Sequence, residues 1–323
     1  MNKENLRIVY MGTPDFAVKP LRVLVESGYQ VVCVITMPDK PAGRGMKLRY
    51  SPVKDYALSK KIPILQPEKL KDPEFLAALK TFKADLQIVV AFRMLPELVW
   101  AMPPMGTFNL HASLLPQYRG AAPINWAVMN GEKETGVTTF FLQQAIDTGD
   151  LLLQEKIDVG PDECVGSVHD RLMELGGRMV LKTVNVILNG SVNARPQNTV
   201  VSDESALKSA PKLFKENTRI DWKGGCESLH NFIRGLSPFP SAWSELHSKE
   251  GEIIGLKIFE AGYVLTSHNL APGTLVSDGK KELKVAVNDG YILLKRFQLA
   301  GRKALTTDEF LRGFSRITDF FFV

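Results

Sequence analysis

Short apolar runs alternate with amphipathic segments through the first half of this chain, and this rhythm restricts the fold more than any other feature. The run Val31–Ile35 is continuous and rich in β-branched residues, as expected for a strand covered on both faces. Similar strands are expected at 6–10, 62–65 and 86–91, and helices at 14–27, 53–60 and 73–82. This alternation predicts an α/β fold with an open, mostly parallel, Rossmann-like sheet and helices on both faces.

The character of the chain changes after residue 189. The elements expected in the second half are strands at 137–142 and 151–157, helices at 165–188 and 226–236, and short strands at 242–246, 253–259, 273–276, 283–287 and 291–297. The short strands are separated by turn signals, which is typical of a small barrel. We therefore predict a first domain over 1–189, a polar linker over 190–208 and a small C-terminal OB-like β-barrel domain over 209–323.

Composition and motif content exclude several classes of protein. Of the 323 residues, 45% are hydrophobic and 23% are charged, as in an ordinary soluble globular protein. No apolar run approaches the roughly 18 residues of a membrane span, and the polar N-terminus lacks the apolar core of a signal peptide. The three cysteines, Cys33, Cys164 and Cys226, are far apart and fit a reducing cytoplasm. The histidines show no metal-ligand spacing, so we expect no metal.

Basic residues are concentrated in two stretches. Between Asp39 and Lys54 there are five basic residues and one acid, largely within a Pro- and Gly-rich segment (37–52) that we predict to be a loop. Between Lys280 and Lys303 there are seven basic residues and two acids. These clusters could bind a polyanion if they share a face. Two solvated loops are the simpler alternative.

Asn109 and His111 are two residues apart, directly after the expected strand 106–108. On an extended backbone their side chains share one face, and an amide beside an imidazole can stabilise charge on a carbonyl oxygen. Asp147, in Asp-Thr-Gly-Asp, can fix the tautomer and protonation of the imidazole. Taken alone, the short spacing is more typical of a strand end, a hydrogen-bonded histidine and a turn aspartate. The position of this pair beyond the carboxyl edge of a parallel sheet, where ligands bind, favours a ligand-binding site instead.

Longer motifs surround these residues in a specific order. They are Gly12–Ala17, Pro38–Gly45, Asn109–Pro116, Tyr118–Ile124, Glu134–Thr138, Asp147–Asp150, Pro238–Trp243 and Ala271–Thr274. With them the chain resembles the methionyl-tRNA formyltransferase family over essentially its whole length. The Asn-x-His-x-Ser-Leu-Leu-Pro motif with the later Asp resembles that of the wider formyltetrahydrofolate-using family, which includes glycinamide ribonucleotide formyltransferase. The Pro-Ala-Gly-Arg-Gly loop and the C-terminal barrel favour the tRNA-modifying members.

The resemblance implies a reaction and a set of site residues. The formyl group of 10-formyltetrahydrofolate would move to the α-amine of methionine on initiator tRNA, by direct attack of the amine and without a metal. Asn109, His111 and Asp147 would be catalytic. The folate would contact Ser113, Leu114, Leu115 and Pro116. The tRNA would contact Lys40, Arg44, Lys47, Arg49, Lys295, Arg296, Arg302 and Lys303. We expect a cytoplasmic monomer with no membrane contact.

Two alternatives and two local questions stay open at this point. The chain could instead formylate a small amine or hydrolyse the folate, or it could bind tRNA without catalysis; the Arg44 loop, the second domain and the complete Asn-His-Asp set speak against these.

In the segment Ala91–Pro96, Arg93 stands where the family usually has glycine, which leaves the pterin contacts undetermined. The apolar segment Phe320–Val323 either packs on the barrel or forms a contact surface.

Overall fold

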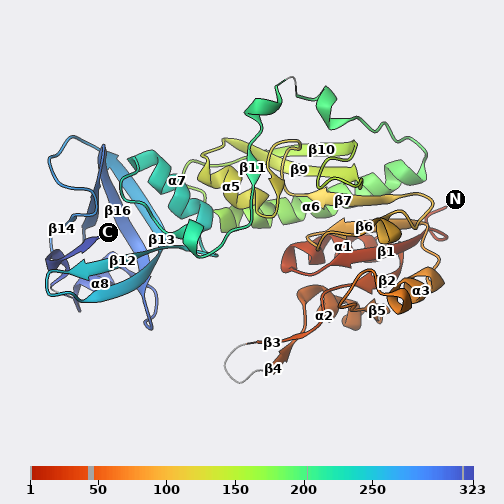
Figure 1. Cartoon of the computed structure of the whole chain (residues 1–323), viewed down its shortest axis with the longest axis horizontal. Helices are drawn as coiled ribbons and strands as arrows, with labels where there is room; N and C mark the ends of the chain where they lie inside the picture. The colour runs from red at the N-terminus through yellow and green to blue at the C-terminus, as the bar shows by residue number, and fades with distance from the viewer. Residues whose placement is uncertain (1, 43–46, 202, 315) are drawn as a thin grey trace. The chain divides into compact units, whose positions relative to one another are not determined.

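The computed structural model describes residues 2–42, 47–201, 203–314 and 316–323. The chain divides into two compact units, each described by itself below (Figure 1). The N-terminal unit consists of Met1–Gly120, Thr135–Ile157 and His169–Ser209. The C-terminal unit consists of Ala121–Glu134, Asp158–Val168 and Ala210–Val323. The barrel unit therefore includes two short stretches that precede it in the sequence.

A seven-stranded sheet forms the centre of the N-terminal unit, in the order β10-β9-β7-β6-β1-β2-β5 (Figure 1). The strands are β1 (Arg7–Gly12), β2 (Gln30–Ile35), β5 (Ile64–Leu65), β6 (Leu86–Val90), β7 (Thr107–His111), β9 (Glu134–Phe141) and β10 (Leu151–Asp158). The pairs β1–β2, β1–β6, β2–β5 and β6–β7 are parallel, and β7–β9 is antiparallel. The predicted open, mostly parallel α/β sheet is confirmed.

Helices cover both faces of this sheet. The helices of this unit are η1 (Asp15–Ala17), α1 (Val18–Glu26), α2 (Pro52–Ser59), α3 (Pro73–Thr81), α4 (Glu97–Trp100) and most of α6 (Val165–Leu188). The helix α5 (Pro123–Met129) and the start of α6 belong to the C-terminal unit. On one face, Val9, Cys33 and Val89 pack against Phe75 and Leu79 of α3. On the other face, Gly176 of α6 lies so close to Leu110 that a Cβ would be 2.7 Å from Leu110 Cδ2. Alternate strand residues thus enter two separate apolar layers, which is why the strands read as continuous apolar runs.

The Pro- and Gly-rich segment 37–52 is more ordered than predicted. It contains two short antiparallel strands, β3 (Lys40–Ala42) and β4 (Lys47–Arg49), so the expectation of a plain loop was wrong there. Its base is held by Lys54 Nζ, which binds the Asp39 carboxylate and lies 2.8 Å from Gln66 Oε1. The Lys54 ammonium lowers the pKa of Asp39 by hydrogen bonding. Strands of three residues are too short to show a periodic pattern in the sequence, which explains why they were not predicted.

The C-terminal unit is a small antiparallel β-barrel on which helix α7 (Cys226–Leu236) packs. Its strands are β12 (Ala242–Ser248), β13 (Ile253–Leu265), β14 (Leu275–Ser277), β15 (Leu283–Val287), β16 (Gly290–Leu299), β17 (Leu305–Thr306) and β18 (Phe320–Phe322). The short helix α8 (Thr307–Leu311) lies between β17 and β18 in the sequence. The sheet order is β14-β15-β16-β13-β12-β18, and β17 pairs with β16. A bridge between Thr274 and Phe321 joins the two ends of this order. The predicted barrel is therefore confirmed.

The apolar segment at 320–323 packs on the barrel. Phe320 and Phe322 are buried, and Phe321 between them is 40% exposed, as a strand with one covered face requires. The Phe322 ring stacks on Trp222 with centroids 4.5 Å apart. Of the two readings that the sequence left open, the structure supports packing.

Two features are absent from the part of the chain that the structure describes. None of the helices in this part of the chain is long and apolar enough to cross a membrane. In the same residues no group of three or more His, Cys, Asp or Glu side chains could hold a metal ion.

Candidate active site

His111 and Asp147 face each other in the N-terminal unit. His111 is the last residue of β7, and Asp147 lies in the turn between β9 and β10. His111 Nδ1 is 3.8 Å from Asp147 Oδ2, and the side chains are only 7% and 12% exposed. His111 Nε2 is 2.9 Å from the Tyr118 carbonyl oxygen, and because a carbonyl only accepts, Nε2 must carry a hydrogen. The ring is thus anchored at Nε2 and presents Nδ1 toward the carboxylate.

The strand that carries this site is longer than predicted. We expected it to end at Phe108, with Asn109 and His111 beyond it, but both residues belong to β7. Asn109 pairs with Phe140 and His111 with Thr138 of β9. Pairing with the antiparallel strand β9 extends β7 to His111. The local sequence does not show which strand will be its partner, so this extension was not predicted. The two side chains lie on one pleated face, while Leu110 between them turns to the α6 side.

Asn109 has unused hydrogen-bonding capacity. Its Oδ1 is buried and has no hydrogen-bond partner among the described residues. Leaving a buried polar atom unpaired costs roughly 1–3 kcal/mol, so such atoms need an explanation. A side chain that lies two residues from His111 on the same strand face, with an oxygen that no described residue binds, is suited to bind a substrate.

The segment Ser113–Pro116 is held by internal hydrogen bonds. Ser113 Oγ donates to the Gln117 carbonyl at 2.6 Å, and Thr138 Oγ1 donates to the Ser113 carbonyl at 2.6 Å. The Leu115 N–H in turn donates to Thr138 Oγ1 at 3.1 Å. Ser113, Leu115 and Pro116 are buried, and Leu114 is half-buried. Of the four residues expected to contact folate, Leu114 therefore has the most accessible side chain.

The turn that carries Asp147 has an unusual backbone. Asp147 has φ +54°, in the left-handed region that non-glycine residues rarely adopt. Gly149 is so close to β9 that a Cβ would lie 1.6 Å from the Phe141 carbonyl oxygen. The Gly120 N–H donates to Asp147 Oδ2 at 3.0 Å. Close backbone packing and one N–H thus fix where the carboxylate lies.

Replacing Gly149 with alanine should displace this turn and lower the turnover number on the order of 10²-fold, because small displacements of catalytic groups have effects of that size. The new Cβ cannot fit beside Phe141, so the turn has to move. Gly255→Ala is the matched control, since a Cβ there meets no atom within 4 Å. The measurement is kcat for both variants together with their thermal midpoints. A Gly149→Ala variant with unchanged kcat would show that the position of the turn does not matter.

Two polar residues near this turn were not predicted to be site residues. Gln197 and Arg119 form hydrogen bonds with each other, and Gln197 also binds the backbone around Asp147. Arg119 lies within the Tyr118–Ile124 motif, but its sequence position gave no role. Gln197 lies in the polar segment that we predicted to be a linker, and a single glutamine in such a segment carries no signal.

Arg93 anchors its segment to the neighbouring loop. Its guanidinium donates to the carbonyl oxygens of Pro67 and Glu68, the latter at 2.7 Å. Burial lowers the pKa of Arg93. Ala91, at the start of the segment, has φ +46°. The arginine that departs from the family pattern therefore has a structural use, as a bridge between two loops.

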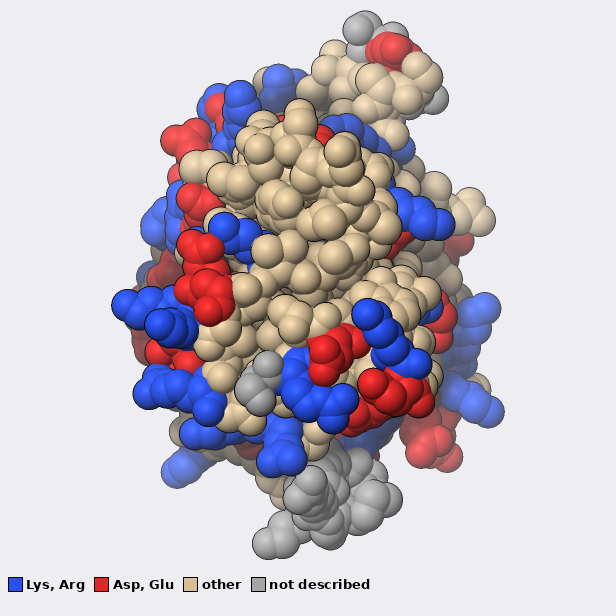
Figure 2. All heavy atoms as spheres, turned by 90° about the vertical axis from the view of Figure 1, so that its left-hand side faces the viewer, with Lys and Arg blue, Asp and Glu red and all other residues tan. Residues whose placement is uncertain are grey.

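The basic residues expected to bind tRNA lie in both units. Lys40 and Arg49 are paired across β3 and β4, and both are exposed. Arg44 lies outside the described residues, and Lys47 is described only in its backbone. Arg302 and Lys303 are exposed after β16. Figure 2, which looks onto the C-terminal unit, shows basic and acidic side chains interspersed around an uncharged central area.

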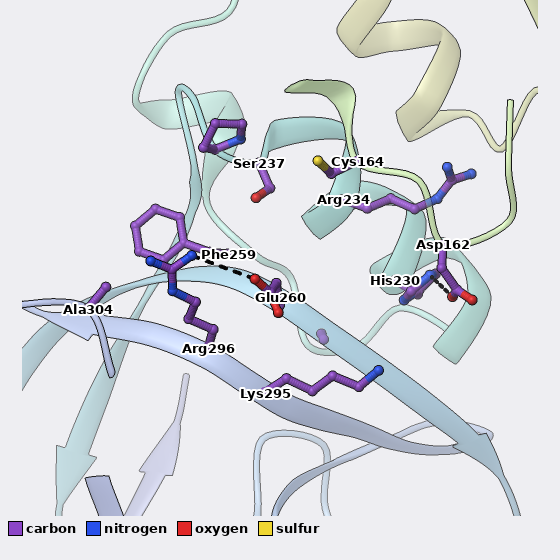
Figure 3. Close-up of a pocket in the computed structure, with 12 residues that line it drawn as sticks. Asp162, Cys164, His230, Arg234, Ser237, Phe259, Glu260, Lys295, Arg296 and Ala304 are labelled. Carbon is purple, nitrogen blue, oxygen red and sulfur yellow. Dashed lines mark ion pairs between the residues drawn. The ribbon is translucent and has the colours of Figure 1, made fainter. Parts of the chain in front are cut away.

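Lys295 and Arg296 of β16 line a pocket of about 490 Å³ in the C-terminal unit (Figure 3). Arg296 Nη1 is 3.7 Å from Glu260 Oε1 on the same wall. On the opposite side, His230 Nε2 is 3.2 Å from Asp162 Oδ1. The His230 ring is buried, which lowers its pKa. The two predicted basic residues thus lie at an open, mixed-charge recess.

Comparison with known families decides the affiliation of the chain. The family described as Formyl transferase matches residues 6–184, and its C-terminal domain matches residues 212–315. The chain belongs to the formyl transferase family. It is 62% identical over 315 residues to the methionyl-tRNA formyltransferase of Bacteroides fragilis, with 97% of each chain covered. It is 61% identical over 321 residues to that of Bacteroides thetaiotaomicron, with 99% and 98% covered.

Solved structures show the formyl transferase fold at low identity. HypX from Aquifex aeolicus in complex with tetrahydrofolic acid has a TM-score of 0.62 and 19% identity, and covers 96% of this chain; the chain spans about half, 47%, of HypX. WlaRD, a sugar 3N-formyl transferase crystallised with dTDP and 5-N-formyl-THF, has a TM-score of 0.61 and 17% identity. That match covers 92% of this chain and 99% of WlaRD.

Proposed function

We propose that this chain transfers the formyl group of 10-formyltetrahydrofolate to the α-amino group of methionine on initiator methionyl-tRNA. The observation that carries the proposal is the pair of His111 and Asp147, 3.8 Å apart. His111 lies on the strand that also carries Asn109, whose buried Oδ1 has no hydrogen-bond partner among the described residues. The 62% identity to methionyl-tRNA formyltransferases supports the choice of donor and acceptor.

The chemistry follows from these three side chains. The neutral amine attacks the formyl carbon, a C–N bond forms, and negative charge develops on the formyl oxygen. Asn109 donates its amide hydrogen to that oxygen, which a preorganised donor stabilises strongly. The bond from the formyl carbon to N10 then breaks, the amine loses a proton, and N10 takes one up.

His111 is the proton carrier in this proposal. Its Nε2 is already bonded to the Tyr118 carbonyl, so Nδ1 is the atom left for the reaction. Asp147 stabilises positive charge on the ring at 3.8 Å. The distance exceeds a hydrogen bond, and catalytic contacts of this kind often shorten only when substrate is bound.

The test is a direct assay of the product. The protein is incubated with 10-formyltetrahydrofolate and methionyl-tRNA, and formyl-methionyl-tRNA is separated from its precursor. Parallel reactions contain free methionine, a small amine or no acceptor. Formylation of the tRNA alone supports the proposal, whereas formylation of the small amine or release of free formate at the same rate supports the alternative reaction.

The basic residues of both units are proposed to bind tRNA phosphates. Affinity should then fall steeply with salt, and loss of one phosphate contact should reduce the slope of log K against log salt by about one. We expect this reduction for Lys295→Ala and for Arg296→Ala. Lys182→Ala, on the exposed side of α6 and outside both clusters, is the control. Salt titration of tRNA binding measures the slopes; identical slopes for all four proteins would contradict the assignment.

We also propose a cytoplasmic monomer. The separated cysteines fit a reducing compartment, and Cys33 and Cys226 have pKa values raised to about 12 by burial, so these thiols stay protonated. Asn109, His111 and Asp147 all come from one unit of one chain, so the site needs no second copy. Sedimentation of the purified protein tests the oligomeric state.

A further inference from the structure

Gln197 binds the backbone of the turn that carries Asp147. Its side chain is buried, with only 4% of the residue exposed. Gln197 Nε2 donates to the carbonyl oxygen of Asp147 at 2.8 Å and to that of Gly149 at 2.9 Å. Both hydrogens of one amide are thus used on one turn, 48 to 50 residues away in the sequence.

Arg119 determines which way this amide points. Its Nε and Nη2 lie 3.1 and 2.6 Å from Gln197 Oε1. A guanidinium has no acceptor, so it requires the oxygen of the amide, and the two carbonyls require the nitrogen. The orientation of Gln197 therefore follows from its neighbours, and a flipped amide would lose all four contacts.

The short segment Tyr118–Gly120 contacts both partners of the candidate catalytic pair. The Tyr118 carbonyl accepts from His111 Nε2, and the Gly120 N–H donates to Asp147 Oδ2. The side chain of Arg119, between them, reaches Asp147 through Gln197. One segment thus holds the imidazole, the carboxylate and the backbone that supports the carboxylate.

The left-handed backbone of Asp147 makes this support necessary. A non-glycine residue in such a conformation costs of order 1–3 kcal/mol and persists only where its surroundings impose it. Gln197 binds the carbonyl group of Asp147 itself, and Gly120 binds its carboxylate. The segment 195–199 is in turn fixed to β10, because Leu151 and Arg195 exchange two backbone hydrogen bonds of 2.8 and 3.0 Å.

We propose that Gln197 and Arg119 are positioning residues that hold the Asp147 carboxylate opposite His111 during formyl transfer. The inference rests on the proposed function, since it gives these residues a role in that reaction. Neither touches the reacting atoms. Their effect on rate passes through Asp147 and therefore depends on Asp147 being present.

A double-mutant cycle tests this dependence. In the otherwise unchanged protein, Gln197→Ala should lower kcat for formylation of methionyl-tRNA by about 10- to 100-fold, with both KM values within about 2-fold. Gln197→Glu, which keeps the size and the acceptor for Arg119 but cannot donate when ionised, should be impaired to a similar extent. In an Asp147→Ala background, Gln197→Ala should cost less than about 2-fold, because the group that it positions is gone.

A merely structural role predicts a different pattern. Loss of general stability would reduce activity by the same factor in both backgrounds, and that result would overturn the proposal, as would an unchanged kcat for Gln197→Ala. Asn198→Ala is the matched control, since its side chain is exposed beside Gln197 and should leave kcat unchanged. Failure of the unsubstituted protein to formylate methionyl-tRNA would contradict the proposed function instead, so the two failures are distinguishable.

Discussion

His111→Ala should lower the turnover number for formyl transfer by about 10²–10⁴-fold, the range expected when a general acid–base group is lost. The imidazole presents Nδ1 to Asp147, and in the proposed reaction this nitrogen carries the proton. Asp147→Asn should also lower turnover strongly, because it keeps the shape of the side chain and removes the charge that stabilises the ring. The affinity for tRNA should change little in both variants.

Single-turnover formylation and equilibrium binding of methionyl-tRNA measure these two effects separately. His169→Ala is the control: this histidine is partly exposed on α6, pairs with Asp170 and contacts the Phe16 ring. It should retain the activity of the unsubstituted protein. Normal turnover in His111→Ala would remove the histidine from the mechanism, and loss of tRNA binding would assign it to recognition of the acceptor.

Asn109→Ala should lower kcat by about 10²–10³-fold, as expected when one donor to a developing oxyanion is removed. Asn109→Asp should be worse, because it places a negative charge where negative charge develops. Asn109→Ala should not destabilise the fold much. The Oδ1 atom of Asn109 has no partner among the described residues, and removing an unsatisfied polar group can be neutral or stabilising.

Asn125→Ala provides the opposite case. Asn125 Nδ2 donates to the Gly235 carbonyl at 2.9 Å within the C-terminal unit, so its loss should lower the free energy of unfolding by about 1 kcal/mol while kcat stays normal. Denaturant unfolding and steady-state kinetics on both variants measure the contrast. A stable fold with lost activity for Asn109→Ala, against the reverse for Asn125→Ala, is the expected result; equal destabilisation by both would make Asn109 a structural residue.

Elements with strong local periodicity could be predicted from the sequence. The helices α6 and α7 have the predicted bounds, because both are long, amphipathic and flanked by polar or turn residues. The four-residue helix α4 and the seven-residue helix α5 were not predicted, since neither is long enough to show a period. The extension of β7 to His111 depends on its antiparallel partner β9, which local sequence does not reveal.

In the candidate site, too, some residues could be predicted from the sequence and others could not. Asn109, His111 and Asp147 stand in motifs whose residue types suggest their chemistry. The hydrogen bonds of Gln197 join residues that are 48 to 78 positions apart in the sequence, including its bond with Arg119. Glutamine and arginine are also common on solvated surfaces, so their presence in the sequence does not indicate such a role. Such supporting residues become visible only when the fold brings them to the group that they support.

The composition of the C-terminal unit from three stretches of chain limits how this enzyme can be recombined. Within that unit Trp126 Nε1 donates to the Pro211 carbonyl at 2.8 Å, and Arg234 Nη1 donates to the carbonyls of Gly160 and Glu163. A chimaera with a single crossover near residue 190 would separate the barrel from Trp126 and Gly160, and would remove Gln197 from the Asp147 turn. Because two of the three stretches are internal and the third begins at Ala210, exchange of the whole unit between relatives requires five matched junctions. For the same reason, we expect the barrel and the catalytic unit to be inherited together rather than exchanged as independent domains.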